Sequence, residues 1–195
     1  MAFTNFDTKE INCKIIYFGA DHCGKSENLR SIYASTADEM KSGIMELDDP
    51  DKGSKYFDFL PISLGHVNDF HIKLHLFTLP AKNLFETVAS VLLKGVDGFV
   101  FVVDSRLERL AANIECYRSV DRLFREEGYD LGELPRVVQY NKRDLSGLVP
   151  LDVLREELNP FGGAEQEAIA SESVGTMETL QVMAKQILVS LAPSG

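Results

Sequence analysis

The sequence predicts an α/β protein with a mostly parallel sheet in one domain, and two observations carry this prediction. Short apolar runs typical of buried strands alternate along the chain with segments whose apolar residues recur at helical spacing. The 195 residues are 45% hydrophobic and 26% charged, which is the size and balance of one globular domain. Because no internal repeat, linker or low-complexity stretch is visible, we expect residues 1–195 to form that single domain.

The predicted strands are apolar runs bounded by glycine, proline or polar residues. They cover residues 11–18, 55–64, 70–79, 96–103, 136–140 and 167–171. The second and third are close enough to form a hairpin with its turn at 65–69. Residues 70–79 alternate apolar and polar side chains, which indicates one buried face.

The predicted helices carry apolar residues three and four positions apart. They cover residues 25–34, 83–94, 107–127, 151–158 and 177–191. Residues 37–54 are polar and rich in glycine and aspartate, so we expect a long loop. Loops of this length inside a compact domain are usually functional.

Charge and cysteine content exclude several classes of function. The net charge of -10 argues against binding to nucleic acid or to anionic lipid. Cys13, Cys23 and Cys116 lack metal or redox spacing, which favours a reducing cytoplasm. No segment suggests a signal peptide, a membrane span or a lipidation site, so membrane recruitment would need a partner.

A phosphate-binding loop is the clearest motif. Residues 19–26 read GADHCGKS and match G-x-x-x-x-G-K-[ST] in full, between a predicted strand and a predicted helix. In this loop backbone N–H groups and a helix N-terminus face the phosphates. Lys25 would reach the β and γ phosphates, and the Ser26 hydroxyl would bind Mg²⁺. The predicted nucleotide-binding residues are Gly19, Asp21, His22, Cys23, Gly24, Lys25, Ser26 and Glu27.

The interior of this loop is unusual in composition. A carboxylate at Asp21 repels phosphate unless a cation intervenes, so Asp21 either faces solvent or disturbs affinity and catalysis. His22 lies beside it, close to the expected γ phosphate. Cys23 is either a thiol with a lowered pKa near Lys25 or a small packed residue.

A second motif indicates which base is bound. Asn141, Lys142, Arg143 and Asp144 follow the predicted strand 136–140 and resemble the N-K-x-D guanine motif. Asp144 can accept from N1–H and from the 2-amino group of guanine, a pair of donors that adenine lacks. Asn141 can hold the loop and reach N7, while the Lys142 stem can cover the base face.

A fainter third element supports the same base. Ala170 and Ser171 end the last predicted strand and resemble the final guanine loop, with the Ala170 N–H facing the base oxygen. GTP or GDP with Mg²⁺ is therefore the predicted ligand.

The whole chain resembles the MglA family of bacterial Ras-like GTPases, which set cell polarity and motility. The residues that carry the resemblance are 25–29 (KSENL), 56–61 (YFDFLP), 95–105 (GVDGFVFVVDS), 141–145 (NKRDL) and 178–180 (ETL). It implies a six-stranded G domain with helices on both faces, whose GTP-bound form engages effectors at a cell pole. The implied partners are a roadblock-type activating protein, a polar scaffold and helical-repeat effectors, and we expect a monomer.

The first switch departs from the family. The family has an arginine followed by a threonine, where the threonine binds Mg²⁺ and the arginine acts as a built-in arginine finger. This chain has Gly53 and Ser54, so only a hydroxyl remains. Ser26 and Ser54 are therefore the predicted metal ligands.

The second switch departs from the pattern of ordinary Ras-like proteins. Thr78 stands where most of them have a metal-side aspartate, and the MglA family already has threonine there, which makes Asp58 the carboxylate of interest. Ala81 replaces a glycine, and Lys82 replaces the glutamine that orients water. An arginine finger supplies about 10³–10⁵ in rate, so we predict slow intrinsic hydrolysis.

Two ways in which GTP could still be hydrolysed efficiently, and two other functions, remain open. Ser54 and Lys82 are the candidate catalytic residues, and a partner could insert an arginine. One alternative function is a scaffold with a decayed nucleotide site. The other is an ATP-dependent kinase, which the Asn141–Asp144 segment argues against.

Overall fold

The computed structural model describes residues 3–48, 55–67, 69–79 and 86–191. The strands are β1 (Phe3–Asn5), β2 (Glu10–Phe18), β3 (Met45–Asp48), β4 (Lys55–Val67), β5 (Phe70–Thr78), β6 (Gly98–Asp104), β7 (Arg136–Asn141) and β8 (Ala164–Glu167). The α-helices are α1 (Lys25–Ser35), α2 (Glu86–Leu93), α3 (Leu110–Glu126), α4 (Leu151–Leu158) and α5 (Thr176–Leu191). Short 3₁₀ turns are η1 (Asp38–Met40), η2 (Leu107–Arg109) and η3 (Ala170–Glu172).

The eight described strands form one sheet in the order β3-β4-β5-β2-β6-β7-β8, and β1 pairs with β2. The pairs β5–β2, β2–β6, β6–β7 and β7–β8 are parallel. The hairpin β4–β5 and the short strands β1 and β3 add antiparallel pairs. The predicted α/β class with a mostly parallel sheet is confirmed.

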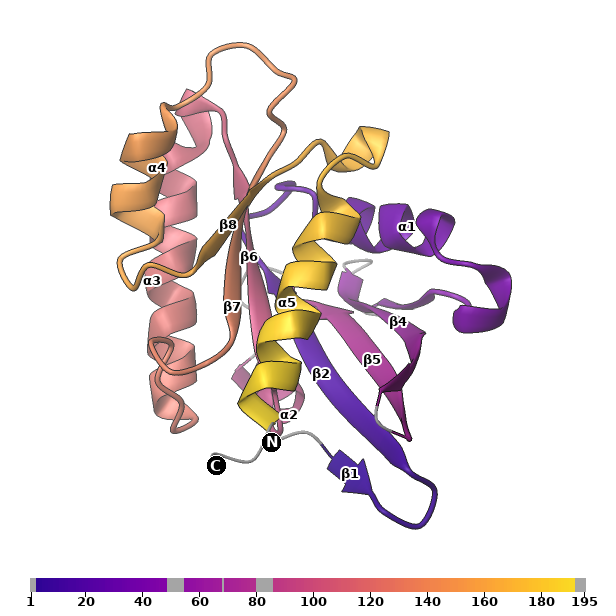
Figure 1. Cartoon of the computed structure of the whole chain (residues 1–195). Helices are drawn as coiled ribbons and strands as arrows, with labels where there is room; N and C mark the ends of the chain where they lie inside the picture. Colours follow the sequence, from indigo (N-terminus) through magenta and orange to yellow (C-terminus); the bar gives the residue numbers. More distant parts are fainter. Residues whose placement is uncertain (1–2, 49–54, 68, 80–85, 192–195) are drawn as a thin grey trace.

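Helices cover both faces of this sheet, with α1 and α5 on one side and α2, α3 and α4 on the other (Figure 1). On the first face, α1 contributes Leu29 and Ile32 to a buried cluster that α5 completes with Leu180 and Met183. Parallel strands buried on both faces read as continuous apolar runs, and all seven residues of β6 are buried.

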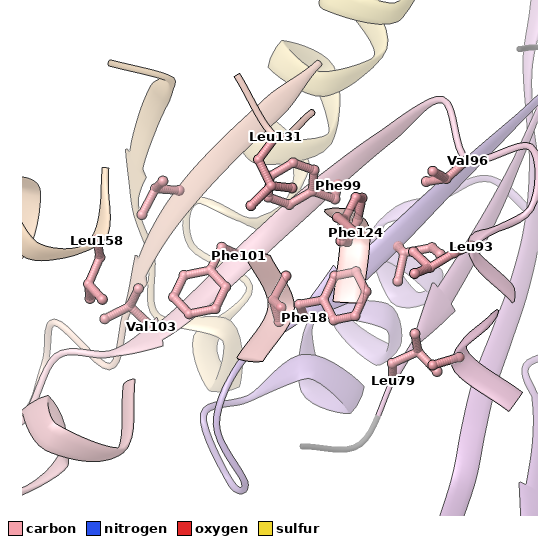
Figure 2. Packing of buried hydrophobic residues seen from close by; sticks show 14 of the residues in the cluster. Phe18, Leu79, Leu93, Val96, Phe99, Phe101, Val103, Phe124, Leu131 and Leu158 are labelled. Carbon is pink, nitrogen blue, oxygen red and sulfur yellow. The ribbon is translucent and has the colours of Figure 1, made fainter. Parts of the chain in front are cut away.

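An aromatic cluster fixes the central strands against α3 (Figure 2). Phe124 of α3 contacts Phe18 of β2 and Phe99 of β6, with ring centroids 5.4 Å and 5.2 Å apart. Edge-to-face and tilted pairs of this kind add about 0.5–1.5 kcal/mol beyond the area they bury. The cluster therefore holds β2 and β6 firmly, and the candidate site lies at their C-terminal ends.

Several predicted boundaries were wrong. The predicted loop 37–54 contains η1 and β3 within its described part, and the sheet has eight described strands instead of six. The last strand is Ala164–Glu167, whereas residues 170–172 form η3. The strand β4 continues to Val67, through the predicted turn. The strands β3 and β8 are short and polar and are defined by pairing, for example Met45 opposite Phe59, so no apolar run marks them.

None of the helices in the described part of the chain has both the length and the hydrophobicity needed to cross a bilayer.

Candidate nucleotide-binding site

The phosphate loop connects the C-terminal end of β2 to the first turn of α1, as the motif requires. Gly19 and Gly24 both have positive φ, 148° and 109°. A Cβ on Gly19 would lie 2.2 Å from the Val102 carbonyl oxygen, and a Cβ on Gly24 would lie 2.2 Å from the amide nitrogen of Asn141. Only glycine fits either position, because both the backbone angle and the available space exclude a side chain.

The Lys25 side chain is buried within the curl of the loop. Its ammonium donates to the carbonyl oxygens of Gly19 over 2.7 Å and of Ala20 over 3.1 Å. Gly24 caps α1 without a side-chain hydrogen bond, so the helix N-terminus presents its own N–H groups. A lysine charge and a helix N-terminus at one loop form a place where a phosphate is stabilised.

A cavity of about 350 Å³ lies at this loop and is lined by His22, Gly24, Lys25, Ser26, Glu27 and Arg30. Ser26 is half-buried in it, which suits a hydroxyl that would bind a metal ion beside a phosphate. The guanidinium of Arg30 is held by Glu27 over 3.3 Å and by Glu46 of β3 over 3.1 Å. These residues fit a phosphate with Mg²⁺, because a cation, a hydroxyl and helix N–H groups converge on one space.

The three unusual loop residues occupy different environments. Asp21 is half-buried, and its carbonyl oxygen accepts from Arg109. His22 is exposed and has a φ of 63°, a left-handed conformation that costs a non-glycine residue about 1–3 kcal/mol. Cys23 is fully buried, and burial raises the pKa of its thiol although Lys25 acts to lower it. Cys23 is thus a small packed residue of the α1–α5 cluster.

Asn141 joins three segments that are far apart in sequence. Its amide nitrogen donates to the Cys23 carbonyl over 2.8 Å, and its amide oxygen accepts from the Ala170 N–H over 3.0 Å. The side chain therefore fixes the phosphate loop relative to η3. The Ala170 N–H was expected from the sequence to face the base oxygen. In this structure it donates to the Asn141 side chain.

Lys142 lies between the phosphate loop and a buried carboxylate. Its ammonium donates to the His22 carbonyl over 2.6 Å and to Asp104 over 2.8 Å. Its backbone has a φ of 63°, which is left-handed. The Lys142 ammonium is therefore held against the phosphate loop itself, a contact that the sequence did not predict.

The remaining predicted base-reading residues lie at the exposed edge of this region. Asp144 and Ser171 are both exposed, while Arg143 is fixed by its N–H to the Ala168 carbonyl and by its guanidinium to Glu167. An exposed carboxylate next to the fixed Asn141 can meet a ligand that arrives from solvent.

A chain of buried side chains, which no sequence motif predicts, connects the phosphate loop to α5. Asn28 donates to the Gly24 carbonyl and exchanges two hydrogen bonds with Gln139 of β7, over 2.9 Å and 2.8 Å. Gln139 also donates to Thr179, whose hydroxyl donates to the Gly175 carbonyl. All three side chains are fully buried, so this network ties the two ends of the site together.

The switch residues are only partly described. Gly53, Ser54, Ala81 and Lys82 lie outside the described residues, so the predicted catalytic pair Ser54 and Lys82 and the metal ligand Ser54 stay predictions. Asp58 and Thr78 lie in the described part. Both are buried, and they hydrogen-bond to each other across β4 and β5.

The parallel sheet, the phosphate loop between β2 and α1, and the NKRD segment after β7 together define a Ras-like P-loop protein of the small GTPase class. No family model matches the chain. The chain is 42% identical to the mutual gliding-motility protein MglA of Myxococcus xanthus (strain DK1622), over all 195 residues and the full length of that relative. The chain therefore belongs to the MglA family, as the resemblance implied.

Proposed function

We propose that the protein is a guanine-nucleotide switch whose GTP-bound form engages effectors to control cell polarity or motility. The name of the Myxococcus xanthus relative, a mutual gliding-motility protein, supports motility as the process. The proposed effectors are a polar scaffold or helical-repeat proteins, and the proposed activator is of the roadblock type. The protein would act as a cytoplasmic monomer that a partner recruits to a cell pole.

The observation that carries this proposal is the position of Asn141. One amide side chain contacts both the phosphate loop at Cys23 and the η3 segment at Ala170. A base bound beside Asp144 would then have its phosphates at Lys25, since both motifs are fixed to the same residue. Binding of a nucleoside phosphate needs this coupling between the two motifs, whereas binding of a free phosphate would not.

Each residue has a proposed task. The Lys25 ammonium would bind the β and γ phosphates, and Asp144 would accept from N1–H and the 2-amino group of guanine. Ser26, together with Ser54, would hold Mg²⁺, which lowers the repulsion between phosphate oxygens when bound. Asp58, buried beside Thr78, is the proposed carboxylate on the metal side.

Hydrolysis is proposed to be slow without a partner. Gly53 and Lys82 lack the arginine and the glutamine that would stabilise the transition state and orient water. Asp21 adds a negative charge to the loop that receives the γ phosphate.

Nucleotide preference tests the binding proposal. With Mg²⁺ present, GTP and GDP should raise the melting temperature, ATP should not, and ITP, which lacks the 2-amino group, should act weakly. Asp144→Ala should abolish the preference for GTP over ITP, whereas Asp152→Ala on α4 is the control. A larger shift with ATP would favour the kinase, and no shift with any nucleotide would favour the scaffold.

Hydrolysis needs a separate measurement. The protein is loaded with GTP and Mg²⁺, excess nucleotide is removed, and the bound nucleotide is identified by chromatography over several hours. Persistent GTP supports slow intrinsic hydrolysis. GDP within minutes would show that another residue, such as Lys82, performs the chemistry.

A further inference from the structure

Arg109, at the end of η2, contacts the phosphate loop although no motif includes it. Its Nη2 donates to the carbonyl oxygen of Asp21 over 2.7 Å, across 88 residues of sequence. The Arg109 side chain is 28% exposed, so the contact lies at the wall of the site. A charged donor at this distance makes one of the stronger kinds of protein hydrogen bond.

Three successive carbonyl groups of the loop are held in this way by three different side chains. Arg109 binds the carbonyl of Asp21, Lys142 that of His22, and Asn141 that of Cys23. In a trans peptide the carbonyl and the following N–H point in opposite directions, and the described chain contains no cis peptide. Each side chain therefore also sets the direction of the next N–H in the loop.

The contact made by Arg109 sets the direction of the His22 N–H. Because the Asp21 carbonyl points at Arg109, the His22 N–H points away from it. The Cys23 N–H closes a turn onto the Ala20 carbonyl over 3.2 Å. Loops of this kind bind anions through N–H groups that face the ligand. Since the Cys23 N–H is already used within the loop, the His22 N–H is the group whose direction the Arg109 contact sets.

The buried carboxylate of Asp104 aligns the basic side chains around it. Asp104 ends β6, is fully buried, and lies 2.8 Å from the Lys142 ammonium and 3.9 Å from Arg109 Nε. Arg106 donates to both of its oxygens, over 3.0 Å and 2.8 Å. The buried Asn113 donates to the Asp104 backbone carbonyl over 2.8 Å, which fixes the residue itself.

Electrostatics are consistent with this arrangement. Burial acts to raise the pKa of Asp104, but hydrogen bonds from Arg106 and Lys142 outweigh it, and the net pKa is lowered. Asp104 therefore stays negative at neutral pH. Within the described residues, Arg109 Nε is buried without a hydrogen-bond partner, so its position depends on the charge of Asp104 and on the bond to Asp21.

We propose that Arg109 is a positioning residue of the phosphate loop, aligned by Asp104, which slows release of bound guanine nucleotide by holding the Asp21–His22 peptide. This inference rests on the proposed function and deepens it. Arg109 would bind the loop backbone and not the nucleotide, so it should change retention without changing the choice of base.

Arg106 provides a matched control. It binds the same carboxylate, and its side-chain hydrogen bonds within the described residues go to Asp104 and Glu108. Arg106 and Arg109 are similarly exposed, at 30% and 28%. Removing Arg106 tests the surroundings of Asp104, while removing Arg109 tests the contact with the loop.

The experiment measures dissociation of a fluorescent GDP from the Mg²⁺-loaded protein after addition of excess unlabelled GDP. Arg109→Ala should release it about tenfold faster, the size expected for loss of one hydrogen bond from a charged donor. Arg106→Ala should stay within roughly twofold of the unchanged protein, and Arg109→Lys should restore part of the retention. The preference for GTP over ITP should be the same in all four proteins.

Amide hydrogen exchange provides a readout that does not need nucleotide. Residues 19–26 should exchange roughly fivefold faster in Arg109→Ala and at the unchanged rate in Arg106→Ala. Equal dissociation in Arg109→Ala and the unchanged protein, or an equal effect of Arg106→Ala, would overturn the inference. If the unchanged protein bound no guanine nucleotide, the proposed function would fail, and equal exchange of residues 19–26 in Arg109→Ala would separately refute the positioning role.

Discussion

Asp58 on β4 and Thr78 on β5 are joined by two hydrogen bonds in the buried part of the sheet. The Asp58 N–H donates to the Thr78 hydroxyl over 2.8 Å, and that hydroxyl donates to the Asp58 carboxylate over 3.1 Å. Thr78 pairs with Tyr17, two residues before the phosphate loop begins. Because β5 contains no acidic residue, the carboxylate beside Thr78 comes from the neighbouring strand β4.

Thr78→Val should destabilise the protein by about 1–3 kcal/mol, because a buried N–H and a buried carboxylate each lose one partner while the volume stays similar. Thr78→Ser, which keeps the hydroxyl and removes a methyl group, should cost about 1 kcal/mol or less. Urea unfolding of both variants measures the difference. Equal costs would show that the hydroxyl contributes little.

Gly24→Ala should abolish nucleotide binding, because the new Cβ would lie 2.2 Å from the Asn141 amide nitrogen at a φ of 109°. Gly128→Ala is the control, since its φ of 82° is also positive but open space surrounds it. The control should lose only about 1–2 kcal/mol of stability through its backbone. Calorimetric titration with GDP and Mg²⁺ checks both, and tight binding by Gly24→Ala would disprove the clash.

Gln139→Leu should destabilise the protein by about 2–4 kcal/mol, because Asn28 and Thr179 would both lose a buried hydrogen-bond partner. The cross-strand neighbour Gln166 is less buried, and within the described residues its side chain donates to the Glu167 carbonyl alone, so Gln166→Leu should be near neutral. Chemical unfolding compares the two. Similar small losses would mean that the buried network does not stabilise the fold.

Glu165 should make stability depend on pH in the acid range. The hydrogen bond from Arg155 lowers the pKa of Glu165 below its usual 4.5, against the opposing effect of burial. A lowered carboxyl pKa contributes stability that is fully present above pH 4.5 and is lost as the pH falls through the folded pKa. Because Arg155 is half-exposed, solvent screens this ion pair and the contribution should be small.

Glu165→Gln should therefore flatten the dependence of the free energy of unfolding on pH below 4.5. Near neutral pH, that dependence should change little. Glu156→Gln, on the exposed side of α4, is the control for removal of one carboxylate, because Glu156 is outside the Arg155–Glu165 ion pair. Thermal melts between neutral and acid pH supply both curves. A Glu165→Gln curve that still matched the unchanged protein would rule out this source.

Motifs contained in one short segment were predictable. The phosphate loop was found because Gly19, Gly24 and Lys25 are fixed by the geometry of a single turn, and their neighbours in sequence are their neighbours in space. The strand β6 was found for a similar reason, since a strand buried on both faces reads as a continuous apolar run, here residues 99–103. The strands β3 and β8 were missed or misplaced, because pairing with β4 and β7 defines them more than composition does.

By itself, the sequence determined the α/β class, the two nucleotide motifs and the membership of the MglA family. Only the tertiary structure decided which side chains hold the phosphate loop, since Arg109, Asn141 and Lys142 reach it across 88 to 120 residues. It also decided that Asp58 lies against Thr78 and that Gln139 connects α1 to α5. The physical reason is that a hydrogen bond depends on the distance between two atoms, and the packing of the sheet and helices sets that distance.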